Sequence, residues 1–131
     1  MERPFLDTNV LVYAFSDDPR SAIAEALLSA GPETSVQALN EFANVARRKL
    51  GFAWPEVRQG LAAIRTLCRA IHPLDLEVHE EAIGLAADHG FALFDALIVA
   101  SALRAGCTVL HSEDMQHDRV IGGLRINNPF R

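Results

Sequence analysis

Three acidic residues of this chain stand directly beside short apolar segments, where a sheet edge would place a carboxylate. Asp7 follows the apolar pair at 5–6, and Asp114 comes shortly after the apolar segment 108–110. Asp95 lies between Phe94 and Ala96, at the head of the most hydrophobic stretch of the chain. Because an open α/β sheet carries its chemistry at the carboxyl ends of its strands, we expect Asp7 and Asp114 to share one rim, with Asp95 nearby. Glu41, inside a helix expected over 34–50, is a fourth candidate for this rim.

Each of these four acids also has an ordinary structural explanation. Asp7 can cap the helix that Thr8 and Asn9 begin, and Asp114 can be a turn residue. Glu41 can be a surface glutamate paired with Arg48, and Asp95 can be a first-turn acid held by backbone N–H groups. Asp118, four residues after Asp114, could face the same way only if that segment is helical, and we interpret it as a solvated acid.

Convergence of several acids on one rim would point to a metal site, because carboxylates cannot crowd together without cations. Hard oxygen donors favour Mg²⁺ or Mn²⁺ over zinc. The five histidines are scattered and show neither HxxxH nor HExxH spacing. His111 and His117 flank Asp114, and we expect at most a weak contact of these two with substrate.

The elements that must position these acids alternate along the chain. Asp18 and Pro19 are expected to start one helix, and Asp75 to cap another. Helices are expected over 18–30, 34–50, 55–70, 75–89 and 94–105, and strands over 5–6, 33–35, 70–72, 108–110 and 124–126. We see no hairpin turn between neighbouring strands, so the pattern predicts an α/β fold: a short parallel sheet of about five strands with helices on both faces, in three layers.

Composition sets the frame for this fold. The chain has 131 residues and is 50% hydrophobic, which fits a single domain over residues 1–131 with its own core. No apolar run reaches membrane-spanning length and no signal segment is evident, so we expect a cytoplasmic protein with no membrane partner. Cys68 and Cys107 stand singly and are interpreted as reduced core residues. The net charge of −5 argues mildly against a nucleic-acid partner, unless clustered acids bind cations that attract phosphate.

Four segments together resemble the PIN-domain ribonucleases, most of all the VapC-type toxins of bacterial toxin–antitoxin pairs. They are FLDTNVLVYAF at 5–15, SVQALNEFANVARRKL at 35–50, LFDALIVASAL at 93–103 and LHSEDMQHD at 110–118. In this resemblance the catalytic and metal-binding acids of the family fall on Asp7, Glu41, Asp95 and Asp114. The supporting polar positions fall on Thr8, Asn9 and Ser112, whereas Asp118 stands where the family has no fixed acid.

The resemblance implies metal-dependent hydrolysis of single-stranded RNA, with Mg²⁺ or Mn²⁺ activating the attacking water and with 5′-phosphate and 3′-hydroxyl products. It also implies a VapB-like antitoxin, seated on the helices at 20–30 and 36–50, and a homodimer. A non-catalytic PIN-like domain that only binds RNA or protein is the main alternative. A phosphoacceptor receiver domain is excluded because the only lysine, Lys49, ends a helix, and a dinucleotide-binding module is excluded because residues 7–14 contain no glycine.

Overall fold

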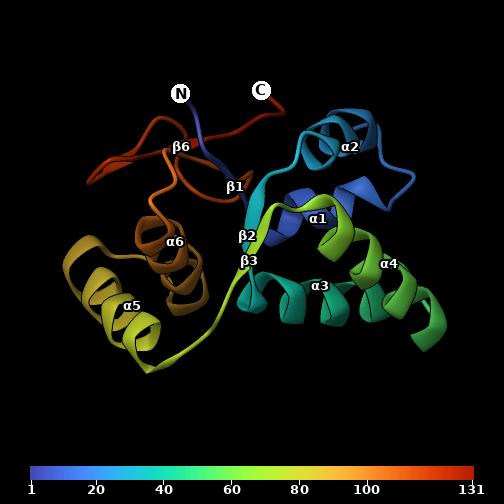
Figure 1. The fold of residues 1–131 in the computed structure, drawn as a ribbon, viewed down its shortest axis with the longest axis horizontal. Helices are drawn as coiled ribbons and strands as arrows, with labels where there is room; N and C mark the ends of the chain where they lie inside the picture. Colours follow the sequence, from blue (N-terminus) through green and yellow to red (C-terminus); the bar gives the residue numbers. More distant parts are fainter.

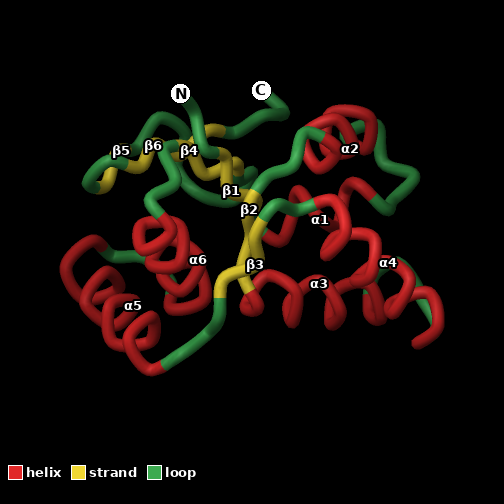
Figure 2. The backbone as a smooth tube through the Cα atoms, in the orientation of Figure 1, coloured by secondary structure: helices red, strands yellow, loops and turns green.

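The computed structural model describes residues 1–131 as one six-stranded sheet covered by helices. Figures 1 and 2 show α5 and α6 on one side of this sheet and the group α1 to α4 on the other. The strands are β1 (Pro4–Leu6), β2 (Glu33–Ser35), β3 (Ala70–His72), β4 (Val109–His111), β5 (Val120–Ile121) and β6 (Leu124–Asn127). The helices are α1 (Thr8–Ala14), α2 (Ser21–Ser29), α3 (Val36–Arg48), α4 (Trp54–Leu67), α5 (Leu76–His89) and α6 (Leu93–Ala105). The α/β class and the three layers are therefore confirmed.

The sheet has the order β3-β2-β1-β4-β6-β5, and every pair except the last is parallel. β5 and β6 form an antiparallel hairpin across Gly122 and Gly123, so the expectation that no neighbouring strands form a hairpin is wrong. A Gly-Gly pair between two strands is a hairpin signal, but β5 has only two residues, too few to show a strand pattern in the sequence. β1 and β4 lie at the centre of the order, so residues that follow them emerge at the middle of one sheet edge.

The core between these layers is one cluster of 22 buried apolar residues, with a smaller cluster of five that joins α5 to α6. Both cysteines are buried and unbridged, as expected for core residues. No single helix is long and apolar enough to cross a membrane; α5 and α6 together reach that length and composition, but across a 116° bend.

β2 lies at the expected position, 33–35, and all three of its residues are polar and yet buried. Glu33 is 1% exposed and accepts hydrogen bonds from Arg3 Nη2 at 3.0 Å and Cys107 Sγ at 3.3 Å, with His72 Nε2 2.9 Å from its Oε1. Burial raises the pKa of Glu33, but the hydrogen bonds from His72, Cys107 and Arg3 outweigh it, so the pKa stays below its ordinary value. Glu33 therefore remains ionised and ties the amino-terminal segment and β3 to the middle of the sheet.

The other two residues of β2 connect it to its neighbours. Thr34 Oγ1 donates to the carbonyl of Leu6 at 2.9 Å, and Ser35 Oγ accepts from the backbone N–H of Ala38 at 3.2 Å. Ser35, the last residue of the strand, therefore caps α3. α2 likewise begins later than expected, at Ser21, because the Asp18 carboxylate accepts from the N–H of Arg20 in a turn before the helix.

Candidate active site

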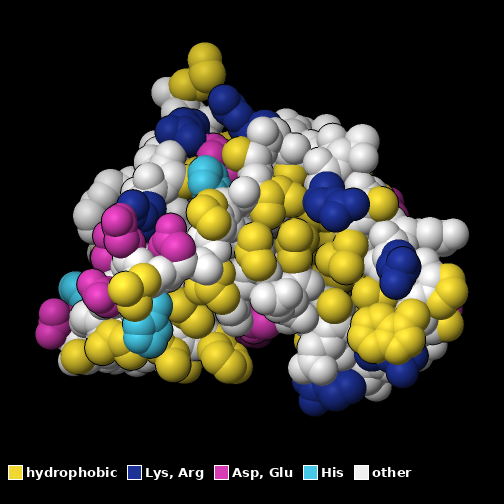
Figure 3. Space-filling view, turned by 60° about the horizontal axis from the view of Figure 1, so that its bottom comes forward, with side chains coloured by type: hydrophobic (Ala, Val, Ile, Leu, Met, Phe, Trp, Pro, Cys, Tyr) yellow, Lys and Arg dark blue, Asp and Glu magenta, His cyan; other side chains and the backbone are white.

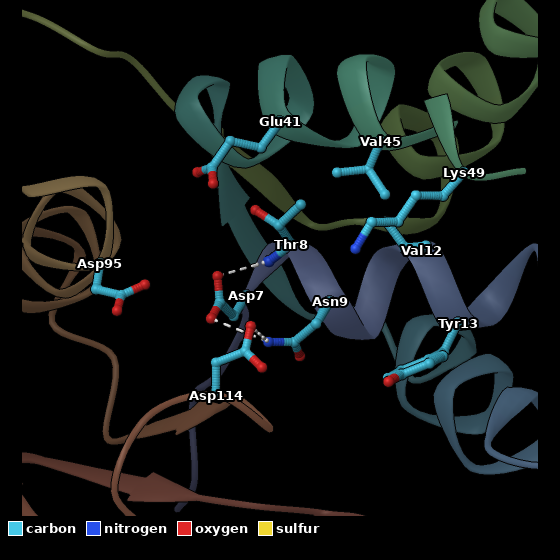
Figure 4. A pocket seen from close by; sticks show the side chains of 10 residues that line it. All are labelled: Asp7, Thr8, Asn9, Val12, Tyr13, Glu41, Val45, Lys49, Asp95 and Asp114. Carbon is cyan, nitrogen blue, oxygen red and sulfur yellow. Dashed lines mark hydrogen bonds between the residues drawn. The ribbon is translucent and has the colours of Figure 1, made fainter. Parts of the chain in front are cut away.

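The carboxyl ends of β1 and β4 open into a pocket of about 270 Å³ whose lining is rich in acids. We call it the acid pocket. Figure 4 shows its four carboxylates coming from four places in the chain: the start of α1, α3, α6 and the loop after β4. Its ten lining residues are Asp7, Thr8, Asn9, Val12, Tyr13, Glu41, Val45, Lys49, Asp95 and Asp114. The structure thus brings together all four acids that the sequence singles out, along with Thr8 and Asn9.

Asp7 lies at the floor of the acid pocket and is 4% exposed. It caps α1, because its Oδ1 accepts from the N–H of Thr8 at 2.7 Å, and its Oδ2 accepts from Ser112 Oγ at 2.7 Å. Burial raises the pKa of Asp7 to about 7 in spite of these two bonds, and the charges of Asp95 and Glu41 act in the same direction. Asp7 therefore caps α1 and lines the acid pocket at the same time. Ser112 is fully buried, so its hydrogen bond to Oδ2 fixes the orientation of this carboxylate.

Asn9 holds two of the carboxylates side by side. Its Nδ2 lies 3.3 Å from Asp7 Oδ2 and 3.2 Å from Asp114 Oδ2, and it donates to both. Its Oδ1 accepts from the backbone N–H of Glu113 at 3.2 Å, which fastens the loop after β4 to α1. One amide side chain therefore sets the position of the exposed Asp114 relative to the buried Asp7.

Glu41 and Asp95 face the pocket from opposite sides with few partners. Glu41 accepts one hydrogen bond, from Gln37 Nε2 at 3.2 Å, and forms no ion pair with Arg48. Burial raises the pKa of Glu41, and the charges of Asp95 and Asp114 add to this effect. Asp95 is the third residue of α6, whose cap position is Ala92, and its carboxylate has no hydrogen-bond partner. Burial and the charge of Asp114 raise the pKa of Asp95.

The donor set of the acid pocket fits a hard divalent cation. Besides the four carboxylates it contains the hydroxyl of Thr8, whose Oγ1 is buried without a hydrogen-bond partner and faces Glu41 in Figure 4. A cation bound here would give this buried oxygen a partner, and it would also offset the repulsion between the carboxylates. As the side chains stand, no three carboxylates or imidazoles converge on one point. Binding of an ion would therefore require these side chains to turn inward, and its charge would offset the repulsion between them.

Asp118 lies outside the acid pocket. Its backbone has a φ of 66°, in the left-handed region, and its carboxylate lies 3.3 Å from His117 Nε2 and 3.6 Å from Arg125 Nη1. His111 and His117 do not line the pocket either, because their rings contact Asn127 and the N–H of Asn128.

Four other lining residues escaped the sequence reasoning: Val12, Tyr13, Val45 and Lys49. The sequence spacing could have indicated Val45 and Lys49, since they follow Glu41 by four and eight residues and therefore share one face of α3 with it. Tyr13 follows Asn9 by four residues in the same way. Its hydroxyl donates to Glu113 Oε1 at 2.6 Å, at the rim of the pocket.

Comparisons with known proteins agree with this geometry. The family model of the PIN domain matches residues 5–122. Searching the curated proteins finds no match to this chain. Among solved structures the fold is similar to VapC20 of Mycobacterium tuberculosis, described as a sarcin-ricin loop cleaving toxin, with a TM-score of 0.70, 22% identity and coverage of 85% of this chain and 89% of that one.

Two further solved structures extend the likeness over nearly the whole chain. A toxin–antitoxin complex from Klebsiella pneumoniae matches with a TM-score of 0.73 and 21% identity, covering 96% of this chain and 97% of that one. VapBC2 from Rickettsia felis, solved with a DNA fragment from its promoter, matches with a TM-score of 0.68 and 17% identity, covering 95% and 96%. At such identities these structures establish a shared fold.

Proposed function

The chain belongs to the PIN-domain family, and from this membership we propose that it is a metal-dependent endoribonuclease that hydrolyses phosphodiester bonds of single-stranded RNA. The observation that carries the proposal is the acid pocket, in which Asp7, Glu41, Asp95 and Asp114 meet from separate parts of the chain. An acid kept for stability is expected to have a cationic or N–H partner, and Asp95 has none. The whole chain would serve as one catalytic domain.

We assign all four acids to binding of the ion, and an additional role to Asp7 and to Asp95. A bound Mg²⁺ or Mn²⁺, held by Asp7, Glu41, Asp95 and Asp114, would supply the positive charge that activates the attacking water and stabilises the phosphate in the transition state. Asp7 is the anchor, because Ser112 and the N–H of Thr8 fix both of its oxygens. Water attacks phosphorus in line as the bond to the 3′ oxygen breaks, leaving 5′-phosphate and 3′-hydroxyl ends.

Asp95 is our candidate for the group that takes the proton from the attacking water. Its carboxylate accepts no hydrogen bond from the protein, so an oxygen that does not hold the ion would be free to accept a hydrogen bond, and then the proton, from the attacking water. Asp114 is a weaker candidate for this role, because Asn9 already donates to its Oδ2.

We further propose that this ribonuclease is the toxin of a toxin–antitoxin pair and forms a homodimer. The fold likeness to toxin–antitoxin proteins supports this assignment. The antitoxin is expected to place an apolar segment on α2 and α3 and a basic side chain in the acid pocket. Five large apolar side chains are also exposed just before α5, along it and at the start of α6, which supports a second protein contact there: Leu74, Leu76, Ile83, Leu93 and Phe94. A strict monomer in light scattering at micromolar concentration, without antitoxin, would contradict the dimer.

The test of the activity is cleavage of total bacterial RNA by the purified protein, with Mg²⁺, with Mn²⁺ and with chelator. We expect discrete cuts with 5′-phosphate ends that require the metal and that disappear in Asp7→Asn, a variant that keeps the shape and the cap of α1. Binding of RNA without any cleavage under all of these conditions would favour the alternative, a non-catalytic PIN-like domain that binds RNA or protein. Undiminished cleavage by a folded Asp7→Asn protein would remove Asp7 from the site.

A further inference from the structure

Lys49 is the only cationic side chain among the ten residues that line the acid pocket. It caps the carboxyl end of α3 through its backbone, and its side chain is exposed. Figure 4 shows its ammonium group pointing back along α3 toward the carboxylates, above Val12. Even so, Lys49 forms no ion pair with any of them. A free ammonium group is thus held at the mouth of an acidic pocket without neutralising it.

The surface around Lys49 is the basic part of an acidic protein. Residues 36–69, which form α3 and α4, contain six of the twelve Lys and Arg residues and only two of the seventeen Asp and Glu residues. None of these six cations takes part in an ion pair, whereas four of the other six do. Figure 3 shows carboxylates gathered on the side of α5 and α6, together with some Lys and Arg, and mainly Lys and Arg on the side of α3 and α4.

The hollow continues past Lys49. A second depression shares Val12, Tyr13 and Lys49 with the acid pocket and extends to Leu50. Two acids also line this depression: Asp18 is paired with Arg20 at 3.0 Å, whereas Asp17 is exposed and forms no ion pair. A strand of RNA whose scissile phosphate lies among the carboxylates would therefore have its next phosphate near the junction of the two hollows, beside an unpaired cation.

We propose that Lys49 binds the RNA phosphate next to the scissile one and so sets the position of the strand in the acid pocket. The inference rests on the proposed ribonuclease function and names its substrate contact. Lys49 would act as a positioning residue: its contact is made equally in the ground state and the transition state, so it should affect KM and leave kcat unchanged. A charge-assisted contact at an exposed site should change KM about three- to tenfold.

Arg48 provides a matched control. It has the same charge, lies at the same end of α3 and is exposed, but it lines neither hollow. Arg48→Gln therefore removes the same contribution to the long-range field and to the helix dipole as Lys49→Gln does. A difference in KM or in salt dependence between the two variants therefore reports the contact between Lys49 and the phosphate.

The experiment uses an oligoribonucleotide that spans the strongest cut mapped in total RNA. Lys49→Gln should raise KM about three- to tenfold with kcat within about twofold, Lys49→Arg should restore most of the KM, and Arg48→Gln should change neither. Binding of the same labelled RNA is then measured against NaCl concentration in the Asp7→Asn background. The slope of log K against log salt should fall in magnitude by about 0.7 for Lys49→Gln, as for one phosphate contact on a single strand, and not for Arg48→Gln.

The two proposals fail in different ways. If the wild type cleaves RNA but Lys49→Gln and Arg48→Gln have the same KM and salt slope, the role of Lys49 is wrong and the activity stands. A fall in kcat without a change in KM would also overturn it, because Lys49 would then act in the chemical step. If Lys49→Gln lowers the salt slope as predicted and Arg48→Gln does not, but the wild type cleaves nothing, the contact stands and the ribonuclease activity is wrong. If it neither binds nor cleaves RNA, both are wrong.

Discussion

The substitution Asp7→Asn should make the metal-free protein more stable, and the gain should grow with pH. Asp7 is 4% exposed, and burial raises its pKa from 3.8 to about 7. One pKa unit corresponds to 1.36 kcal/mol, so ionising this carboxyl in the folded state costs about 4 kcal/mol more than in the unfolded chain. Asparagine keeps the shape of the side chain and an oxygen for the N–H of Thr8, and it carries no charge.

The sign of the pH dependence follows from proton binding. Between pH 3.8 and about 7 the folded protein keeps the Asp7 proton that the unfolded chain has already lost. The free energy of unfolding of the wild type should therefore fall as the pH rises through this window, by up to about 1.4 kcal/mol per pH unit from this group alone. Asp7→Asn lacks this contribution, so the gap between the variant and the wild type should widen by about 2–3 kcal/mol from about pH 5 to about pH 8.

The assay is urea denaturation of both proteins in chelator at several pH values across this range. The change in the gap is the decisive quantity, since the hydrogen bonds lost from Ser112 and Asn9, about 1 kcal/mol each, shift the variant equally at every pH. Asp17→Asn serves as control, because Asp17 is exposed and its carboxylate accepts no hydrogen bond. If the curves of wild type and Asp7→Asn run parallel from pH 5 to pH 8, the carboxyl is not held neutral by burial and the reasoning is refuted.

Two further predictions test the site and the packing. Asp95→Asn removes a repelling charge, so in chelator its melting temperature should equal or exceed that of the wild type. Metal at a hundredfold excess over Kd should stabilise the wild type by about 2.7 kcal/mol and raise its melting temperature, but it should have little effect on the variant. A variant that melts well below the wild type in chelator and still shows the full metal-induced rise would make Asp95 a structural residue. Gly60→Ala should destabilise by about 1–2 kcal/mol despite better helix propensity, because the new Cβ would lie 3.0 Å from Cζ of the fully buried Phe42, whereas Gly84→Ala, in open space on α5, should stabilise by about 0.5–1 kcal/mol. Thermal denaturation of both alanine variants measures this, and a gain in stability for Gly60→Ala would show that Phe42 can move.

The fold could be predicted as far as local apolar patterns reflect it. Alternation of helices with short strands determines a parallel sheet, and the buried apolar helix at 93–105 was evident from its composition. The strand at 33–35 is found where it is expected, but local patterns could not reveal that its three polar residues are buried, because their partners, such as Arg3 and Leu6, lie far away in the chain. Polar residues normally indicate exposure, and only the tertiary structure supplies the donors that reverse that inference.

The candidate site, like the fold, could be predicted only where it follows from local sequence patterns. Asp7 and Asp114 follow strands, so the rule for parallel sheets places them on one rim. That rule says nothing about Asn9, whose amide donates to both carboxylates and reaches Asp114 across 105 residues of sequence. Nor does it indicate which acids lack partners, although this property is what separates Asp95 from an ordinary first-turn aspartate.

Net charge is a weak argument against a nucleic-acid ligand here, because the charge of this protein is unevenly distributed. A value of −5 for the chain argues against a nucleic-acid ligand only if charge is spread evenly, and here it is not. Acids gather at the proposed metal site and on α5, while the six cations of residues 36–69 form no ion pair, and one of them, Lys49, lines the acid pocket. Interactions between exposed charges are screened beyond roughly 8–10 Å, so a strand of RNA would respond to the local surface and not to the sum. The distribution of charge along 36–69, which can be read from the sequence, is therefore a better indicator of an RNA-binding face than the total.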